Sequence, residues 1–407
     1  MGSPKTEKKS VRAMFSEIPR KAKWLIYLTS FSAVGFGYFF IAVSAYYTEL
    51  NISPSSIGLI LGSSGAASVL TAIPMGIYAD KRGRKLPFLL GLFGIPPMLI
   101  VFAFTTDVLF LVVAAVGAGV AEGAFMASWN ALIADMTSAK TRTAAFSLSF
   151  IVGSGTSAFG FVLPLFFPLI EDFTGASSHT VHSGFFIIVA LLALVSPIAL
   201  SFLLRGYKEI VKPGAKLIRG KNLGTVLRFS GCNSLIGLGA GFIIPLIPTW
   251  LWLKFGVPDS SSGPLLAVAN VLMAFSAIAS TALAFRYGSV KAIVLTESLA
   301  TVFMVSLAYI PGAALAGLMY LIRAALMNMS SPISDSYLMG IILPEERGLA
   351  SSINAIVWRL PNSVSTVVGG VILASGNFEL PFLLAAAFYA ASISLFYALF
   401  RNVKPIS

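Results

Sequence analysis

The sequence predicts an all-α integral membrane protein, with twelve transmembrane helices arranged as two pseudo-symmetric six-helix halves around a central cavity. Three observations lead to this fold class: the composition, the length of the apolar segments and the position of the basic residues. Of the 407 residues, 57% are hydrophobic and 11% are charged, and the mean hydropathy is +0.88. Soluble domains carry about 25% charged residues. The composition therefore excludes a soluble enzyme, a disordered chain and a nucleic-acid-binding module.

Twelve apolar segments follow a basic, polar tail. Each supplies the ~20 residues that a membrane-spanning helix needs, and apolar residues lie on all of its faces. The segments are residues 24–47, 56–79, 86–105, 108–134, 143–170, 183–204, 224–253, 262–285, 290–310, 313–338, 349–375 and 379–400. The alternating pattern of a membrane β-barrel is absent. We therefore expect a tail at 1–23, an N-terminal half at 24–204, a linker at 205–223, a C-terminal half at 224–400 and a tail at 401–407.

The basic residues lie almost entirely on one side of these segments. If the amino terminus is cytoplasmic, the cytoplasmic tails and loops hold 25 of the 28 Lys and Arg residues, and the outer loops hold Lys254 alone. The other two, Arg323 and Arg359, lie inside segments. This asymmetry obeys the positive-inside rule. It predicts a multi-pass protein of the plasma or inner membrane with both termini cytoplasmic, and it explains the net charge of +12 without nucleic acid.

Several kinds of chemistry lack the residues that they need. The single cysteine, Cys232, excludes an intramolecular disulfide and a cysteine metal site. His179 and His182 fall in one predicted outer loop, where we expect no metal. The sequence has no phosphate-binding Gly-x-x-x-x-Gly-Lys-Ser/Thr loop, so ATP does not drive the protein directly. Paired carboxylates and His-rich sets are missing from the spans. We therefore expect no cofactor, no metal and no enzymatic activity.

The loop after the second segment is the most specific stretch of the chain. It reads Gly76-Ile-Tyr-Ala-Asp80-Lys81-Arg82-Gly83-Arg84-Lys85. A weaker counterpart follows the eighth segment at 285–291, and residues 131–147 are similar to 336–352 in the other half. From the residues alone, Gly76 would let two helices approach closely, and Gly83 would permit the tight turn. Asp80 would cap or end the helix, and the basic side chains would hold the loop in the cytoplasm.

This loop resembles the signature loop of the major facilitator superfamily of secondary transporters: Gly, three residues, Asp, a basic residue, any residue, Gly, Arg and a basic residue. The resemblance extends over essentially the whole chain. It implies that the loop bonds to neighbouring helix ends and holds the inner gate closed, with Asp80 and Arg84 pairing with Asp135 and Arg142. The predicted gate residues are Gly76, Asp80, Arg82, Gly83, Arg84, Lys85, Asp135 and Arg142. Alternatively, the loop is only a turn and a topology signal.

Three charges inside the spans are the clearest indications of a site. Glu122, Arg323 and Arg359 lie near the centres of the fourth, tenth and eleventh segments. An unpaired charge there costs roughly 2.5–3.5 kcal/mol, so each should face a wet cavity or a partner. The superfamily's cavity is lined by helices one, four, seven and ten. This resemblance implies that Glu122 faces Arg323, either as a proton- or substrate-responsive pair or as a fixed structural ion pair.

The sequence therefore predicts a secondary transporter of a small organic solute, working by alternating access, coupled to protons through Glu122 and with export slightly favoured. Asp335 is the second candidate for the proton. The predicted substrate-cavity residues are Tyr38, Glu122, Met126, Trp129, Asn130, Arg323 and Arg359. The expected partners are a small organic substrate, protons and membrane lipid, with a monomeric chain and no nucleic acid.

Other functions remain open at this point. Span four lacks the early arginine, and span five the late Gly-Pro pair, of the superfamily's proton-coupled drug exporters. The first alternative is therefore an uncoupled facilitator, or an importer of an organic anion held by Arg323 and Arg359. The second is a membrane sensor or scaffold that transports nothing.

Overall fold

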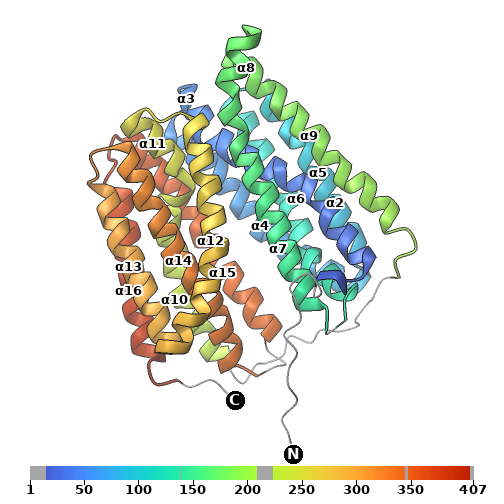
Figure 1. Cartoon of the computed structure of the whole chain (residues 1–407), viewed down its shortest axis with the longest axis vertical. Helices are drawn as coiled ribbons and strands as arrows, with labels where there is room; N and C mark the ends of the chain where they lie inside the picture. Colours follow the sequence, from blue (N-terminus) through green and yellow to red (C-terminus); the bar gives the residue numbers. More distant parts are fainter. Residues whose placement is uncertain (1–14, 139, 209–222, 344–346, 404–407) are drawn as a thin grey trace, which may run out of the picture.

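The computed structural model describes residues 15–138, 140–208, 223–343 and 347–403. These residues form long helices joined by short turns, and both chain ends lie at the same end of the bundle (Figure 1). Most of the predicted amino-terminal tail and linker, and the last four residues of the carboxy-terminal tail, lie outside the described residues.

The first half of the bundle contains six spans, two of which change helix type near one end. A π-helical turn interrupts the first span, and a 3-10 turn that contains Pro164 interrupts the fifth. The elements are α2 (Arg20–Ile41), η1 (Ala42–Tyr46), α3 (Tyr47–Glu49), α4 (Pro54–Arg82), α5 (Lys85–Phe104), α6 (Val108–Asp135), α7 (Arg142–Val162), η2 (Leu163–Phe166), α8 (Phe167–Thr174) and α9 (Ser178–Leu203).

The second half repeats this pattern, and a 3-10 turn interrupts its first span. Its elements are α10 (Leu223–Gly241), η3 (Ile244–Leu246), α11 (Ile247–Phe255), α12 (Asp259–Tyr287), α13 (Ser289–Ala308), α14 (Ala313–Ile341), α15 (Arg347–Ala374) and α16 (Leu380–Phe400). Among the described residues, eleven spans have the length and hydropathy of membrane-crossing helices. The remaining long helix, α12, has 29 residues with no charge between Asp259 and Arg286. The prediction of a two-half, twelve-helix fold is confirmed.

The two halves contact each other mainly through α4 against α15 and through α7 and η2 against α12. Small residues allow α4 and α15 to pack backbone to backbone. A Cβ atom on Gly58 would lie 2.7 Å from the carbonyl oxygen of Thr366, and a Cβ on Gly370 would lie 2.4 Å from that of Pro54. Larger side chains would therefore force these helices apart, as expected for helix packing in a bilayer.

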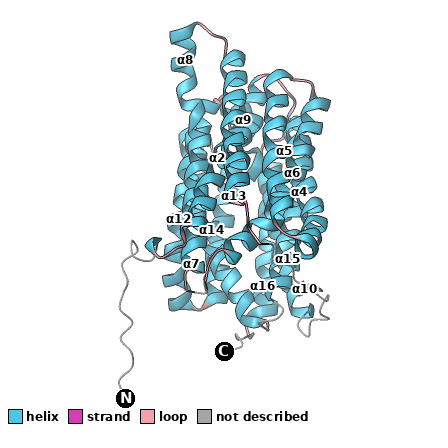
Figure 2. Cartoon of the chain, turned by 90° about the vertical axis from the view of Figure 1, so that its right-hand side faces the viewer, coloured by secondary structure: helices cyan, strands magenta, loops and turns pink. Residues whose placement is uncertain are grey.

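The two ends of the bundle differ in how the halves are joined. The basic end carries the start of α2 and the end of α16, and the far end carries α3, α8 and α11 (Figure 1). Figure 2 shows α8 at the same far end from the side. Toward the far end, one buried apolar cluster includes residues of both halves. Toward the basic end, the described residues form two separate clusters, one in each half. Within the described ranges, the apolar core common to both halves therefore lies at the far end.

Candidate functional site: the central cavity and an ion pair between the halves

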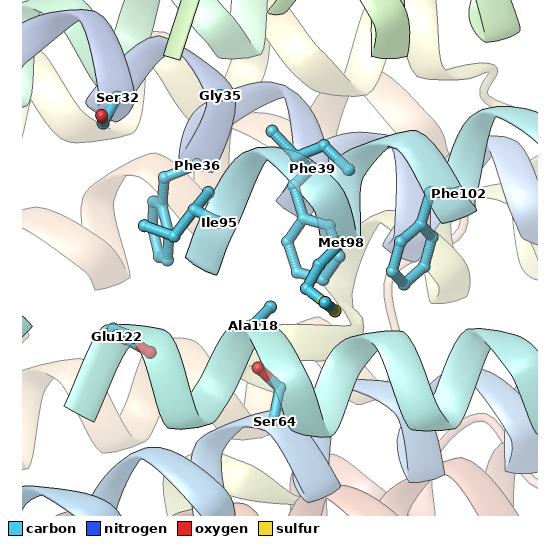
Figure 3. Close-up of a pocket in the computed structure, with 11 residues that line it drawn as sticks. Ser32, Gly35, Phe36, Phe39, Ser64, Ile95, Met98, Phe102, Ala118 and Glu122 are labelled. Atoms are coloured by element: carbon cyan, nitrogen blue, oxygen red, sulfur yellow. The ribbon is translucent and has the colours of Figure 1, made fainter. Parts of the chain in front are cut away.

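Two hollows in the first half are lined by residues of α2, α5 and α6, and they share Ser32, Phe36, Ile95 and Glu122. The larger has a volume of about 260 Å³ and extends from the middle of the bundle toward Ile26 and Trp129, near the basic end. The smaller, of about 60 Å³, extends toward Phe39 and Phe102, near the far end. Figure 3 shows the aromatic and aliphatic side chains that line the smaller hollow on one side, with Ala118 and Glu122 of α6 opposite them.

Glu122 lines both hollows. The other described side chains that line them are uncharged. Oε1 of Glu122 accepts a hydrogen bond from Nη2 of Arg359, and the two groups form an ion pair. The Glu122 side chain is 18% exposed and the Arg359 side chain is 35% exposed. Because Glu122 belongs to α6 and Arg359 to α15, this pair connects the first half to the second at mid-height.

The expected pairing of Glu122 with Arg323 is wrong. Arg323 is 4% exposed, donates a hydrogen bond to the hydroxyl of Tyr389 and lies 5.5 Å from the centre of that ring. It therefore lies on the face of α14 turned toward α16, inside the second half. The expectation rested on the position of α14 in the bundle, whereas the rotation of the helix about its axis decides which partner Arg323 meets.

Of the other predicted cavity residues, two line the larger hollow and the rest do not. Met126 and Trp129 line the larger hollow. Tyr38 instead lies in the core of the first half, where its hydroxyl donates to the backbone carbonyl of His182. Asn130 is exposed on α6 and is not among the lining residues, and Asp335 is exposed on α14.

Some of the contacts expected of the predicted gate motif are present. Gly83 ends α4 at a φ of 111°, a left-handed value that favours glycine, so its predicted role in the turn is confirmed. The next residue, Arg84, forms an ion pair with Asp135 and donates to the carbonyl of Ala131 at 3.4 Å. The hydroxyl of Tyr207 also donates to Asp135, at 2.8 Å. These contacts bind the α4–α5 turn to the end of α6 within the first half.

The other gate residues do not follow the expected pattern. Arg142 donates to the carbonyl of Ala134 at 3.3 Å instead of pairing with Asp80, and Asp80 is exposed, as is Arg82. Gly76 was expected to allow close helix approach, but open space surrounds the position that its Cβ would occupy. Close approach occurs instead at Gly58 and its neighbours on α4. The Lys85 side chain is half-buried at the start of α5.

The two histidines lie in a helix and not in the predicted outer loop. His179 and His182 lie in the first turns of α9, and His182 is 2% exposed. Its Nε2 lies 2.8 Å from Oδ2 of Asp259, on α12 of the other half. An acidic residue at the start of α12 was the available signal, but a contact between residues 77 positions apart depends on the tertiary fold. Among the described residues, no group of three or more His, Cys, Asp or Glu side chains could hold a metal ion.

The family model of the Major Facilitator Superfamily matches residues 25–366. The chain belongs to this superfamily. That membership and the fold agree with the resemblance of the loop at 76–85, and they identify the protein as a membrane transporter and not an enzyme.

The chain is similar to known proteins in sequence and in fold. The chain is 32% identical over 141 residues, 34% of each protein, to an uncharacterized MFS-type transporter, YqjV, of Bacillus subtilis. It is 22% identical to Multidrug resistance protein MdtG of Proteus mirabilis, over 91% of this chain and 94% of that protein. Its fold matches a bacterial homologue of the human lysosomal transporter Spinster in an inward-facing, unoccupied conformation, with a TM-score of 0.73 at 16% identity, over 94% and 98% of the two chains.

Proposed function

We propose that this transporter exports small amphipathic organic molecules in exchange for protons, and that Glu122 carries the proton. The observation that carries the proposal is the ion pair between Glu122 and Arg359, because it joins the two halves at a carboxylate that lines both hollows. Movement of the halves must change the distance between these groups. A carboxylate that exchanges an arginine for a proton during that movement couples proton binding to the position of the halves.

The state of the bundle fits one step of such a cycle. The halves share a core at the far end, and each has its own core near the basic end. With the basic end in the cytoplasm, as the distribution of basic residues favours, this is an inward-facing arrangement. An ionised Glu122 bound to Arg359 corresponds to a transporter that has released its proton to the cytoplasm and is ready for substrate.

The lining of the cavity supports an amphipathic substrate that is neutral or positively charged. Aromatic and aliphatic side chains, including Phe36, Phe125 and Trp129, supply most of the larger hollow. Glu122 is its charged lining residue, so a cation can replace Arg359 beside the carboxylate. The full-length similarity to a multidrug resistance protein supports the same substrate class and the direction of export.

An importer of organic anions is less well supported. That alternative relies on Arg323 and Arg359 together, but Arg323 is enclosed within the second half and bonded to Tyr389. Arg359 is partly exposed, but it is already paired with the carboxylate of Glu122. An uncoupled facilitator and a non-transporting sensor share the same fold, so transport measurements must separate them from the proton-coupled exporter.

A thermal-shift screen followed by reconstitution tests the proposal. The purified protein is screened against amphipathic cations, neutral amphipathic compounds and organic anions, and a stabilising compound is then offered to proteoliposomes. We expect cationic or neutral compounds to stabilise the protein, and an imposed pH gradient to drive their accumulation. Stabilisation by anions alone would favour the importer, accumulation that ignores the pH gradient would favour the facilitator, and no transport of any stabilising compound would favour the sensor.

A further inference from the structure

A second group of polar side chains joins the halves at the far end, well away from Glu122. His182 of α9 and Glu49 of α3 belong to the first half, and both contact Asp259, the first residue of α12. Nε2 of His182 lies 2.8 Å from Oδ2 of Asp259, and the backbone N–H of Asp259 donates to Oε1 of Glu49 at 2.7 Å. Two side chains of one half therefore hold the amino-terminal end of a helix of the other half, where a carboxylate is favoured by the helix dipole.

The contacts of the imidazole ring indicate how many protons the histidine–aspartate pair holds. Nδ1 of His182 lies 2.8 Å from the carbonyl oxygen of Ser178, which can only accept, and 3.3 Å from the Ser178 hydroxyl, which can donate or accept. The shorter contact assigns a hydrogen to Nδ1. In a neutral imidazole, Nε2 would then present a lone pair to the carboxylate of Asp259. Two acceptors do not form a hydrogen bond, so the 2.8 Å contact requires one further proton between Nε2 and Oδ2. This pair thus holds one proton more than a neutral histidine beside an ionised aspartate.

The pair is enclosed by protein and is almost inaccessible to water. His182 is 2% exposed and Asp259 is 4% exposed. The ring of Tyr46, on the π-helical turn η1, stacks on His182 at 3.5 Å, and Phe167 meets it edge-on at 4.7 Å. A carboxylate enclosed in this way without a hydrogen-bonded partner is costly.

The other titratable groups around the pair come from four elements. The hydroxyl of Tyr38 on α2 donates to the carbonyl of His182, and Tyr46 covers the imidazole ring. Glu49 on α3 accepts from the backbone of Asp259, and Glu171 on α8 acts electrostatically on Glu49 and Tyr46. The groups among them that can carry a charge at neutral pH are the carboxyls of Glu49 and Glu171.

We propose that His182 and Asp259 form a proton-binding site that closes the outer gate, and that closing takes up one proton from the outside. When the gate opens, water solvates both groups and the shared proton is released. The closed state binds more protons, so its stability rises as the external pH falls and is lost as the pH rises. The proton returns to the same side on reopening, so this site biases the position of the halves and does not itself drive transport.

Accessibility of the gate to a membrane-impermeant thiol reagent tests this proposal. The probe is a cysteine at Thr249, a buried residue whose hydroxyl donates across the gate to the carbonyl of Ser44, in full-length protein with Cys232→Ser. The labelling rate from outside is divided by that of a Phe173→Cys variant, because residue 173 is 92% exposed and reports thiol ionisation alone. We expect the corrected rate to rise between external pH 5 and 9, by at most about tenfold per pH unit for a single proton.

Asp259→Asn is the decisive variant. Its amide can donate to the Nε2 lone pair without any extra proton, so the corrected rate should be low and independent of pH. The matched control is Asp172→Asn, which removes an exposed carboxylate of α8 and should keep the normal pH dependence. His182→Phe strands the buried Asp259 carboxylate and should raise labelling at neutral pH.

The proposal is overturned if Asp259→Asn retains the pH dependence of Asp172→Asn, or if the corrected rate falls as pH rises. The proposal rests on the orientation in which the far end faces outward. The assay needs neither substrate nor a proton gradient. If Glu122 proves not to couple export to protons, the result at the outer gate therefore still holds. If the gate assay contradicts the role of His182 and Asp259, the proposed role of Glu122 is unaffected.

Discussion

The interface between the halves and the interior of the second half each hold an arginine within the spans, but in different surroundings. Arg359 reaches from α15 to Glu122 of the opposite half, and both side chains are partly exposed. Arg323 is enclosed by its own half and bonded to Tyr389. A charge whose partner belongs to the other half can change partner when the halves move. A charge enclosed by one half moves with its partner and serves the structure.

Replacing the carboxylate at the interface should have the largest effect. Glu122→Gln keeps the size of the side chain but cannot take up and release a proton, so accumulation driven by a pH gradient should fall to background. Exchange of substrate across the membrane should remain measurable, because the cavity is intact. The measurement is uptake into proteoliposomes with and without a pH gradient, using a compound identified by thermal shift.

The matched control is Glu297→Gln. Glu297 is a buried carboxylate of α13, within the second half, and is 7% exposed. Gradient-driven accumulation per folded molecule should persist in this variant. Equal loss in both variants would mean that burial of a carboxylate, and not its position between the halves, determines the phenotype.

Removing the arginine at the interface should have the next largest effect. Arg359→Gln leaves the Glu122 carboxylate without its partner, and should lower the unfolding free energy by roughly 1–3 kcal/mol, less than for a fully buried pair because both groups are partly exposed. Thermal unfolding in detergent measures this loss. The double variant with Glu122→Gln should recover most of the stability, since no unpaired charge remains. Simple addition of the two single effects would show that the ion pair contributes no coupling.

Removing the enclosed arginine should affect stability more than coupling. Arg323→Ala leaves the buried hydroxyl of Tyr389 without its donor, which costs about 1–3 kcal/mol. The melting temperature should therefore fall, while transport per folded molecule keeps its dependence on the pH gradient. A loss of gradient-driven accumulation with an unchanged melting temperature would show that Arg323 takes part in transport.

Asp80→Asn should have the smallest effect on the state described here. Asp80 is exposed in this state, so the change should alter the free energy of unfolding by no more than about 0.5 kcal/mol. If Asp80 latches the cytoplasmic side when the bundle opens outward, the variant should instead lower the outward-open population and slow transport. Cysteine accessibility from the cytoplasmic side measures that population, and an unchanged population would reduce the motif to a turn and a topology signal.

The fold could be predicted because hydropathy and charge are properties of whole segments. Each span is long and apolar enough to be recognised alone, and the basic residues define one side. The rotation of each span about its axis could not be predicted, because helices that are apolar on all faces do not indicate which face meets the cavity. That is why Arg323 was expected opposite Glu122, and why no partner could be predicted for Arg359.

Contacts between distant residues were also beyond the sequence. Asp259 follows a proline and begins a span, which does not reveal that His182 of the other half lies against it. Close helix packing depends in the same way on which glycines face a neighbour. Gly58 meets the backbone of α15, whereas Gly76, in the more recognisable motif, faces open space.

The central claim is that Glu122 takes up a proton, and infrared difference spectroscopy during acid titration tests it most directly, without a known substrate. A carboxyl that becomes protonated in an apolar setting gains a C=O stretching band. The wild type should show such a band from Glu122, Glu122→Gln should lack it, and Glu297→Gln should keep it. If the spectrum of Glu122→Gln matches that of the wild type over the whole titration, Glu122 does not carry the proton and the proposed coupling is wrong.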